Sequence, residues 1–127
     1  MHKKDLFEYA VIRVVPRVER EEFLNVGVVL YCARQRFLKM LYKINGPRLK
    51  ALCDECDVDS VNEHLQAFQH VCVGGSNAGS IGGLPIAERF RWLTATRSTV
   101  VQTSKVHPGF CEDAGETLEK LFTQLVE

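Results

Sequence analysis

The spacing of hydrophobic positions changes along this chain, from strand-like runs in the first third to helical periodicity further on. Residues 8–15 and 26–32 are short apolar runs rich in β-branched and aromatic residues, which favour β-strands. A third run, Phe37–Tyr42, follows the short polar turn 33–36 and predicts an antiparallel hairpin. Residues 26–32 are apolar at almost every position, so we expect this strand to be central and covered on both faces.

Helical patterns follow the hairpin. Asn45-Gly-Pro47 is a helix-start signal and predicts a short helix over Arg48–Cys56. Ser60 and Glu63 have the spacing of a capping box. A stripe of apolar residues then recurs at helical spacing, at Val61, Leu65, Phe68 and Cys72. Another helix is expected from about Pro85, with Ile86, Phe90 and Leu93 on its apolar face.

The last third of the chain predicts one more strand and one more helix. Thr99–Ser104 is β-branched and strand-like, and Gly109 separates it from a final helix. The buried face of that helix is predicted to hold Ala114, Leu118, Leu121, Phe122 and Leu125. The segment Gly74–Gly83 has too much glycine for a packed element and is predicted to be a mobile loop.

These elements predict a single α+β domain over residues 1–127. We expect a mostly antiparallel sheet of about four strands covered by helices, in the order β-β-β-α-α-α-β-α. A chain of 127 residues with 46% apolar and 25% charged residues has the composition of an ordinary globular domain.

The composition also indicates a compartment. No apolar run approaches the roughly 18–20 residues that cross a membrane, and the first residues lack the apolar region of a signal peptide. The five cysteines are odd in number and irregularly spaced, as in proteins of a reducing compartment. We therefore expect a cytoplasmic protein without a membrane partner.

Charge is unevenly distributed although the net charge is zero. Residues 1–52 hold 11 Lys and Arg against 5 Asp and Glu, and residues 53–127 hold 5 against 11. Such a surface favours protein partners or self-association; alternatively, the charges only solvate one side of the hairpin. Nucleic acid fits less well, because no aromatic residues are interleaved with the basic ones. The predicted partner-binding residues are Arg34, Arg36, Lys39, Lys43, Arg48 and Lys50.

The candidates for catalysis are polar residues in or beside the first two apolar runs and in a polar group late in the chain. They are Arg13, Asn25, Arg97, Gln102, Ser104 and His107. Gln102 and Ser104 alternate with apolar or β-branched neighbours, so they should share one face of a strand. One interpretation is an anion- or peptide-binding surface around Arg13 and Arg97. The other is a structural set of buried polar groups that satisfy loop backbone, with Gly27 permitting close approach.

Two further motifs predict no cofactor. Cys53 and Cys56 form a C-x-x-C motif with two histidines downstream, a spacing that resembles zinc ligands. The motif falls on a predicted helix without a knuckle turn, so we expect no metal. Gly74 and Gly79 have the outer spacing of a P-loop, but Ser80 stands in the position of the lysine.

Several of these segments resemble the bacterial family known as domain of unknown function 3037. The residues that carry the resemblance are Tyr9–Pro16 (YAVIRVVP), Glu22–Leu30 (EFLNVGVVL), Leu93–Arg97 (LTATR) and Gln102–Ser104 (QTS), and it extends from Phe7 to Val126. The turn Arg17–Arg20 is less acidic than is usual in the family, and Gly74–Gly83 looks locally variable.

The family has no assigned activity, but the resemblance implies a role. Family members are often encoded beside a HipA-like kinase, which implies a small partner or regulator in a toxin–antitoxin or defence setting. The leading hypothesis is therefore a non-catalytic protein-binding or regulatory module, with a kinase as partner and a homo-oligomer also open. It would dock through the basic hairpin or through Gly74–Gly83. The alternative is a small enzyme or nucleic-acid processing factor that uses Arg13, Asn25, Arg97, Gln102 and His107.

Overall fold

A computed structural model describes residues 4–97 and 99–127 of the chain. The strands are β1 (Asp5–Val14), β2 (Leu24–Cys32), β3 (Phe37–Tyr42), β4 (Val101–Thr103) and β5 (His107–Cys111). The α-helices are α1 (Gly46–Leu52), α2 (Val58–Val73), α3 (Ile86–Leu93) and α4 (Ala114–Leu125). Two 3-10 segments, η1 (Val18–Arg20) and η2 (Ser76–Gly83), complete the described elements.

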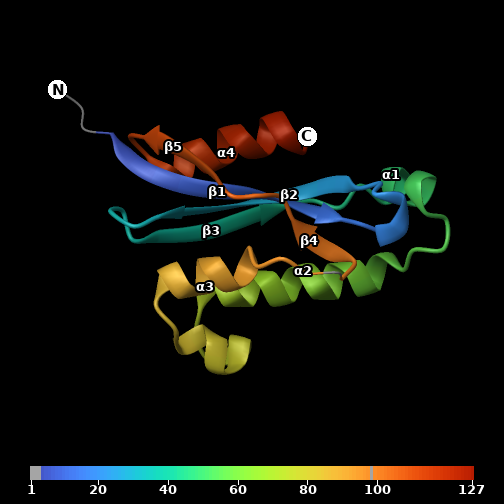
Figure 1. Cartoon of the computed structure of the whole chain (residues 1–127), viewed down its shortest axis with the longest axis horizontal. Helices are drawn as coiled ribbons and strands as arrows, with labels where there is room; N and C mark the ends of the chain where they lie inside the picture. The colour runs from blue at the N-terminus through green and yellow to red at the C-terminus, as the bar shows by residue number, and fades with distance from the viewer. Residues whose placement is uncertain (1–3, 98) are drawn as a thin grey trace.

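The five strands form one open antiparallel sheet built around β1 (Figure 1). The order is β3-β2-β1-β4, and β5 pairs with the same edge of β1 as β4 does. β4 pairs with the end of β1, at Ile12–Val14, and β5 pairs with its beginning, at Asp5–Tyr9. The sheet therefore has two open edges, β3 on one side and β4 with β5 on the other.

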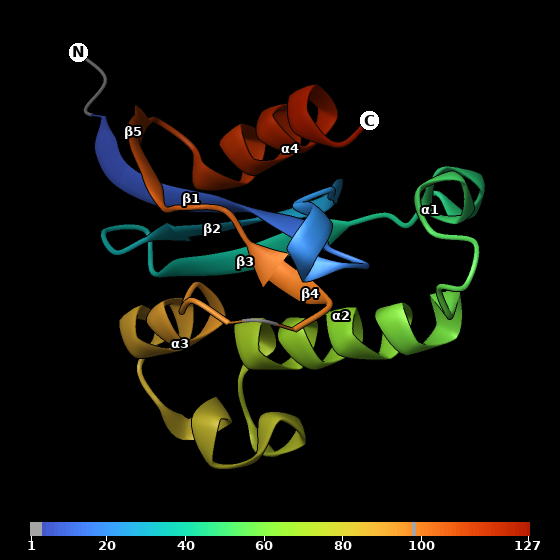
Figure 2. The ribbon, with the colours of Figure 1, turned by 45° about the vertical axis from the view of Figure 1, so that its right-hand side comes forward.

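Helices cover both faces of the sheet (Figures 1 and 2). The larger core lies between one face and the helices α1, α2 and α3, and it includes Ile12, Val29, Met40, Leu65 and Phe90. The smaller core lies under α4 on the other face, and it includes Phe7, Leu30, Cys32 and Leu118. β2 is central and covered on both faces, as predicted, which is why nearly every one of its residues is apolar.

The fold class is confirmed, but the sheet has one strand more than the predicted element order. β5 was missed because Pro108 and Gly109 are typical of turns. The odd residues of β1 direct their backbone hydrogen bonds toward this edge. Val11 bonds to Ser104 in this way, and Val15, directly after β1, donates its N–H to the Val100 carbonyl. Alternation along the strands then turns the nitrogen of Pro108 outward, where its missing N–H costs no ladder bond.

Three local predictions also need correction. α1 begins and ends earlier than predicted, so Cys53 and Cys56 lie in a turn after the helix. α2 begins at Val58 and not at Ser60, because the Asp57 carboxylate caps it by accepting from Asp59 N–H at 3.0 Å. The segment Gly74–Gly83 is not unpacked: most of it forms η2, and two of its side chains, Ala78 and Ile81, pack against the larger core.

Candidate functional site

Three of the predicted site residues form one row across the sheet. Arg13 of β1 pairs with Asn25 of β2 on one side and with Gln102 of β4 on the other. Ile12 and Val14, which flank Arg13, point into the larger core, so the Arg13 side chain lies on the α4 face. The strand register therefore brings these three residues together on the sheet, although no local sequence signal indicates that register.

The row contains two buried polar atoms without a hydrogen-bond partner among the described residues, Arg13 Nε and Asn25 Oδ1. The Arg13 guanidinium lies over the Phe23 ring, 4.1 Å from its centroid. The Asn25 amide donates to the carbonyl of Leu125 at 3.2 Å, which ties β2 to the end of α4. Gln102 donates to the carbonyl of Thr99 at 2.8 Å. Most of the polar groups in this row therefore serve the local fold.

Gly27 and Ser104 have clear structural roles. A Cβ on Gly27 would lie 2.6 Å from the carbonyl oxygen of Leu41, so only glycine fits where β2 and β3 approach. The buried Ser104 hydroxyl accepts from the Val11 N–H at 2.9 Å and donates to the Lys105 carbonyl at 2.9 Å. Ser104 thereby continues the β1 ladder in the gap between β4 and β5, and its hydroxyl is engaged.

The structure separates the other two candidates from the row. His107 pairs with Tyr9, four residues from Arg13 along β1, which is about 13 Å at strand rise. Arg97 lies on the opposite side of the sheet, where its guanidinium carbon is 5.0 Å from the Phe68 ring centroid. The Trp92 ring centroid is 4.8 Å from the same carbon, and burial lowers the pKa of Arg97 from its ordinary value. The proposed surface around Arg13 and Arg97 together is therefore wrong.

The six predicted partner-binding residues are all exposed, and all but Arg34, which lines a hollow with Asp5 and Glu8 of β1, follow the β3 edge. Arg34 and Arg36 lie in the β2–β3 turn, Lys39 lies on β3, and Lys43 directly follows it. Arg48 and Lys50 lie on α1, at the other end of the strand (Figure 1). They form a band of about 20 Å along one edge, since β3 has six residues. No ion pair in the described part of the chain involves any of the six.

The backbone of β3 is open along this edge. The even residues of β1 direct their backbone N–H and C=O groups toward β2. By the same alternation, the odd residues of β3 direct theirs toward β2. The hydrogen bond from Lys43 N–H to the carbonyl of Val26, 2.7 Å, agrees with this register. Leu38, Met40 and Tyr42 therefore direct their N–H and C=O groups outward, and these make no backbone bond to another described element.

A hollow of about 230 Å³ lies at the Lys43 end of the edge. Lys43 and Arg48 line it together with the amides of Asn25 and Asn45, and Glu127 contributes one carboxylate. Asn45 also caps α1 by accepting from the Arg48 N–H at 3.1 Å. This hollow joins the Asn25 end of the polar row to the basic band.

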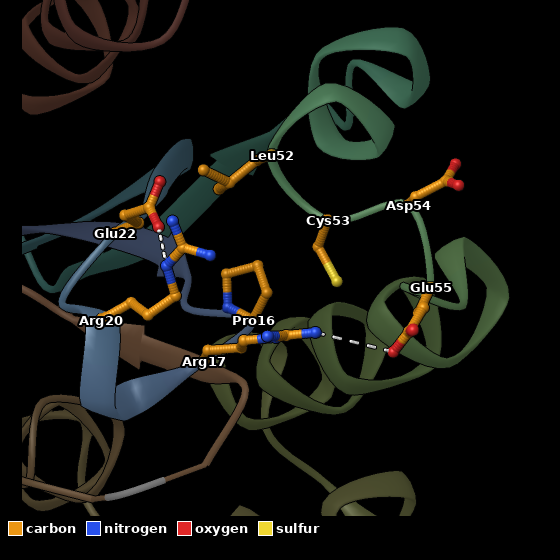
Figure 3. Close-up of a pocket in the computed structure, with 8 residues that line it drawn as sticks. All are labelled: Pro16, Arg17, Arg20, Glu22, Leu52, Cys53, Asp54 and Glu55. Atoms are coloured by element: carbon orange, nitrogen blue, oxygen red, sulfur yellow. Dashed lines mark ion pairs between the residues drawn. The ribbon is translucent and has the colours of Figure 1, made fainter.

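A second hollow, of about 160 Å³, is lined by the first three residues of the C-x-x-C motif, Cys53, Asp54 and Glu55 (Figure 3). Arg17 lies 3.8 Å from the Glu55 carboxylate, and Arg20 pairs with Glu22, so both arginines in this hollow have acidic partners. The Cys53 side chain points into the hollow in Figure 3. Both positive charges of this hollow are thus already paired, and Asp54 adds a further carboxylate.

The chemistry of the C-x-x-C motif does not favour a metal or a reactive thiolate. Burial, and then the hydrogen bond to Cys53, raise the pKa of Cys56 to about 11, so this thiol stays protonated near neutral pH. In residues 4–97 and 99–127 no three His, Cys, Asp or Glu side chains are arranged to hold a metal ion.

Over the same residues, no helix has the length and apolar content needed to cross a bilayer.

Sequence reasoning missed two polar residues that organise the fold around these surfaces. Gln35, in the β2–β3 turn, donates to Asp5 at 3.1 Å and accepts from the first N–H of α4, that of Ala114, at 2.9 Å. Arg89 is buried and donates to the last carbonyls of α2. An apolar-patterned helix gives no signal for such an arginine, because the carbonyls it serves are distant in sequence.

The chain belongs to the family described as "Protein of unknown function (DUF3037)", whose match covers residues 9–126. No curated protein and no solved structure matches the chain.

Proposed function

We propose that this member of the DUF3037 family is a non-catalytic protein-binding module that holds an acidic, extended segment of a partner protein along β3. The observation that carries the proposal is the open β3 edge with a band of unpaired basic side chains. Each feature by itself is common, but their coincidence along one edge of the sheet defines both the shape and the charge of an occupant.

The backbone geometry supports strand addition. The outward groups of Leu38, Met40 and Tyr42 are spaced as in a sheet interior, so an added strand forms regular ladder hydrogen bonds with them. These main-chain bonds supply affinity but no sequence preference.

The charges supply the preference. Lys39 stands in the middle of the edge, with Arg34 and Arg36 at one end and Lys43 and Arg48 at the other. No Asp or Glu occurs between Glu22 and Asp54, so no neighbour in this stretch neutralises the band. The hollow holds the two cations of Lys43 and Arg48 against the one side-chain carboxylate of Glu127, so a cation is left for a carboxylate of the occupant. An acidic segment therefore binds, and a basic one is repelled.

The competing proposal, a small enzyme or nucleic-acid processing factor, has less support. The row of Arg13, Asn25 and Gln102 lies about 13 Å from His107, and the Ser104 hydroxyl is engaged by backbone. In the described part of the chain, no hydrogen bond joins Ser104 or Cys111 to His107 as a nucleophile–base pair requires. The enzyme proposal predicts that His107→Ala abolishes a turnover without lowering the melting temperature.

The family resemblance adds a first partner to test, a HipA-like kinase, and with it a cytoplasmic regulatory role in a bacterial toxin–antitoxin or defence setting. The experiment is a tagged pull-down from the native host, followed by reconstitution of the complex from the purified partner. The wild-type chain is compared with Arg34→Glu/Arg36→Glu/Lys39→Glu. The control, Arg17→Glu/Arg91→Glu/Lys120→Glu, makes the same charge change at three exposed positions elsewhere.

We expect the wild type and the control to bind the partner stoichiometrically, and the β3 variant to bind at least about tenfold more weakly. Far-UV circular dichroism checks that all three proteins are folded. Equal binding by the β3 variant and the wild type would contradict the proposed surface.

A further inference from the structure

The other open edge of the sheet carries a different surface, formed by Leu6, Pro108 and Phe110. Leu6 and Phe110 face each other across the β1–β5 pair, and they are 52% and 69% exposed. Pro108, also exposed, pairs with Glu8 on the same face of the sheet. Two large apolar side chains are thus presented together at the margin of the sheet, where the larger core does not cover them.

The outward backbone groups of β5 are self-complementary, because they include one donor and one acceptor. The odd residues of β5 direct their backbone hydrogen bonds toward β1, so Pro108 and Phe110 direct their backbone groups away from β1. Pro108 lacks an N–H and offers only a carbonyl, whereas Phe110 offers an N–H. An acceptor and a donor therefore stand on either side of Gly109.

We propose that two copies of this chain associate through β5, antiparallel to each other about a two-fold axis at Gly109. In this pairing the Phe110 N–H of each copy donates to the Pro108 carbonyl of the other. Each Phe110 ring then lies opposite a Pro108 ring, and the two Leu6–Phe110 pairs join into one apolar cluster. The missing N–H of Pro108 removes only one bond from each copy.

The charges identify the occupant as a second copy rather than another protein. Lys105 precedes β5, and Glu112 follows it. A two-fold axis at Gly109 places Lys105 of each copy opposite Asp113 of the other and next to Glu112, so the same attraction occurs twice. A uniformly acidic segment, as proposed for β3, would meet Glu112 here and would be repelled.

The test is the mass in solution, measured by sedimentation equilibrium over a range of concentrations. We expect the wild-type chain to reach twice its 14.4 kDa. Phe110→Glu should remain a monomer, and because Phe110 is 69% exposed its melting temperature should equal that of the wild type at concentrations too low for dimerisation. Val73→Glu is the matched control, since Val73 is 74% exposed and lies at the end of α2, and it should still dimerise.

A charge swap tests the antiparallel orientation independently of the apolar cluster. Lys105→Glu and Glu112→Lys should each raise the dimer dissociation constant about tenfold, because each creates two like-charge contacts. The double variant Lys105→Glu/Glu112→Lys should restore it. A wild type that stays monomeric, a Phe110→Glu variant that dimerises normally, or a double variant without rescue would overturn the proposal. Failure here leaves the β3 surface untouched, and its triple variant should dimerise like the wild type.

Discussion

At the scale of single residues, the buried Arg89 is the most unusual feature of the fold. Its Nη1 donates to the carbonyls of Val71 and Cys72, both at 2.9 Å, and its Nε donates to that of Leu84 at 2.9 Å. No carboxylate pairs with it in the described part of the chain. Its charge is instead compensated by the orphan carbonyls and the dipole at the end of α2.

Replacing this arginine with an apolar residue should therefore be costly. Arg89→Met keeps much of the volume but leaves three buried carbonyls without a donor, so we expect a loss of about 3 kcal/mol in the free energy of unfolding. Urea denaturation measures this loss in the free energy of unfolding. Arg91→Met on the exposed face of the same helix is the control and should change stability by less than about 0.5 kcal/mol. Equal effects of the two substitutions would refute the capping role.

Cys72 makes the stability of the protein depend on pH. Burial in the larger core, opposed in part by the charge of Arg89, raises the pKa of the Cys72 thiol from 9.0 to about 12. Above pH 9 the unfolded chain loses this proton while the folded chain keeps it, so alkali favours unfolding. The stabilisation is complete below pH 9 and is lost as pH rises toward 12.

The comparison with Cys72→Ala isolates this effect from the other groups that titrate in alkali. The variant loses packing and is less stable near neutral pH. Its disadvantage in free energy of unfolding should shrink steadily as pH rises from 9 toward 12. A disadvantage that stays constant over that window would show that the Cys72 thiol is not shifted.

At the scale of elements, Ser104 holds two short strands in one register. β4 has three residues and β5 has five, and in the described sheet both strands pair with β1. The Ser104 hydroxyl and N–H bond to Val11 in the gap between them, at 2.9 and 2.8 Å. A strand as short as β4 depends on such a bond, because it has few others.

Ser104→Ala should therefore cost about 1–2 kcal/mol of stability and free the Val11 N–H to exchange with solvent. Hydrogen exchange measured by NMR reports the Val11 amide directly. Ser60→Ala, at an exposed position of α2, is the control and should leave both quantities unchanged. Unaltered protection of Val11 in Ser104→Ala would mean that another group satisfies this amide.

At the scale of the whole molecule, the fold was predictable wherever the signal is local. The short apolar runs predicted β1, β2 and β3, and the helical stripe predicted the buried face of α2, because each depends on side chains close in sequence. β5 was missed because its Pro108 is tolerated only at an outward position, and that position depends on strand pairing.

The candidate site was predictable only in part for the same reason. The alternation around Gln102 predicted the face of the strand on which its side chain lies, and the strand register then placed Gln102 beside Arg13. Arg97 has no such register, since it lies outside the strands and packs against Phe68 and Trp92. The basic residues were found from composition, but their alignment along an open edge follows from sheet order, which the sequence does not encode locally.

The central claim is that an acidic partner segment adds to the sheet at β3, and amide hydrogen exchange in the reconstituted complex tests it most directly. We predict that binding protects the amides of Leu38, Met40 and Tyr42, while the inward amides between them are already protected in the free protein. A tightly bound partner that leaves those three amides exchanging as in the free protein would contradict the account.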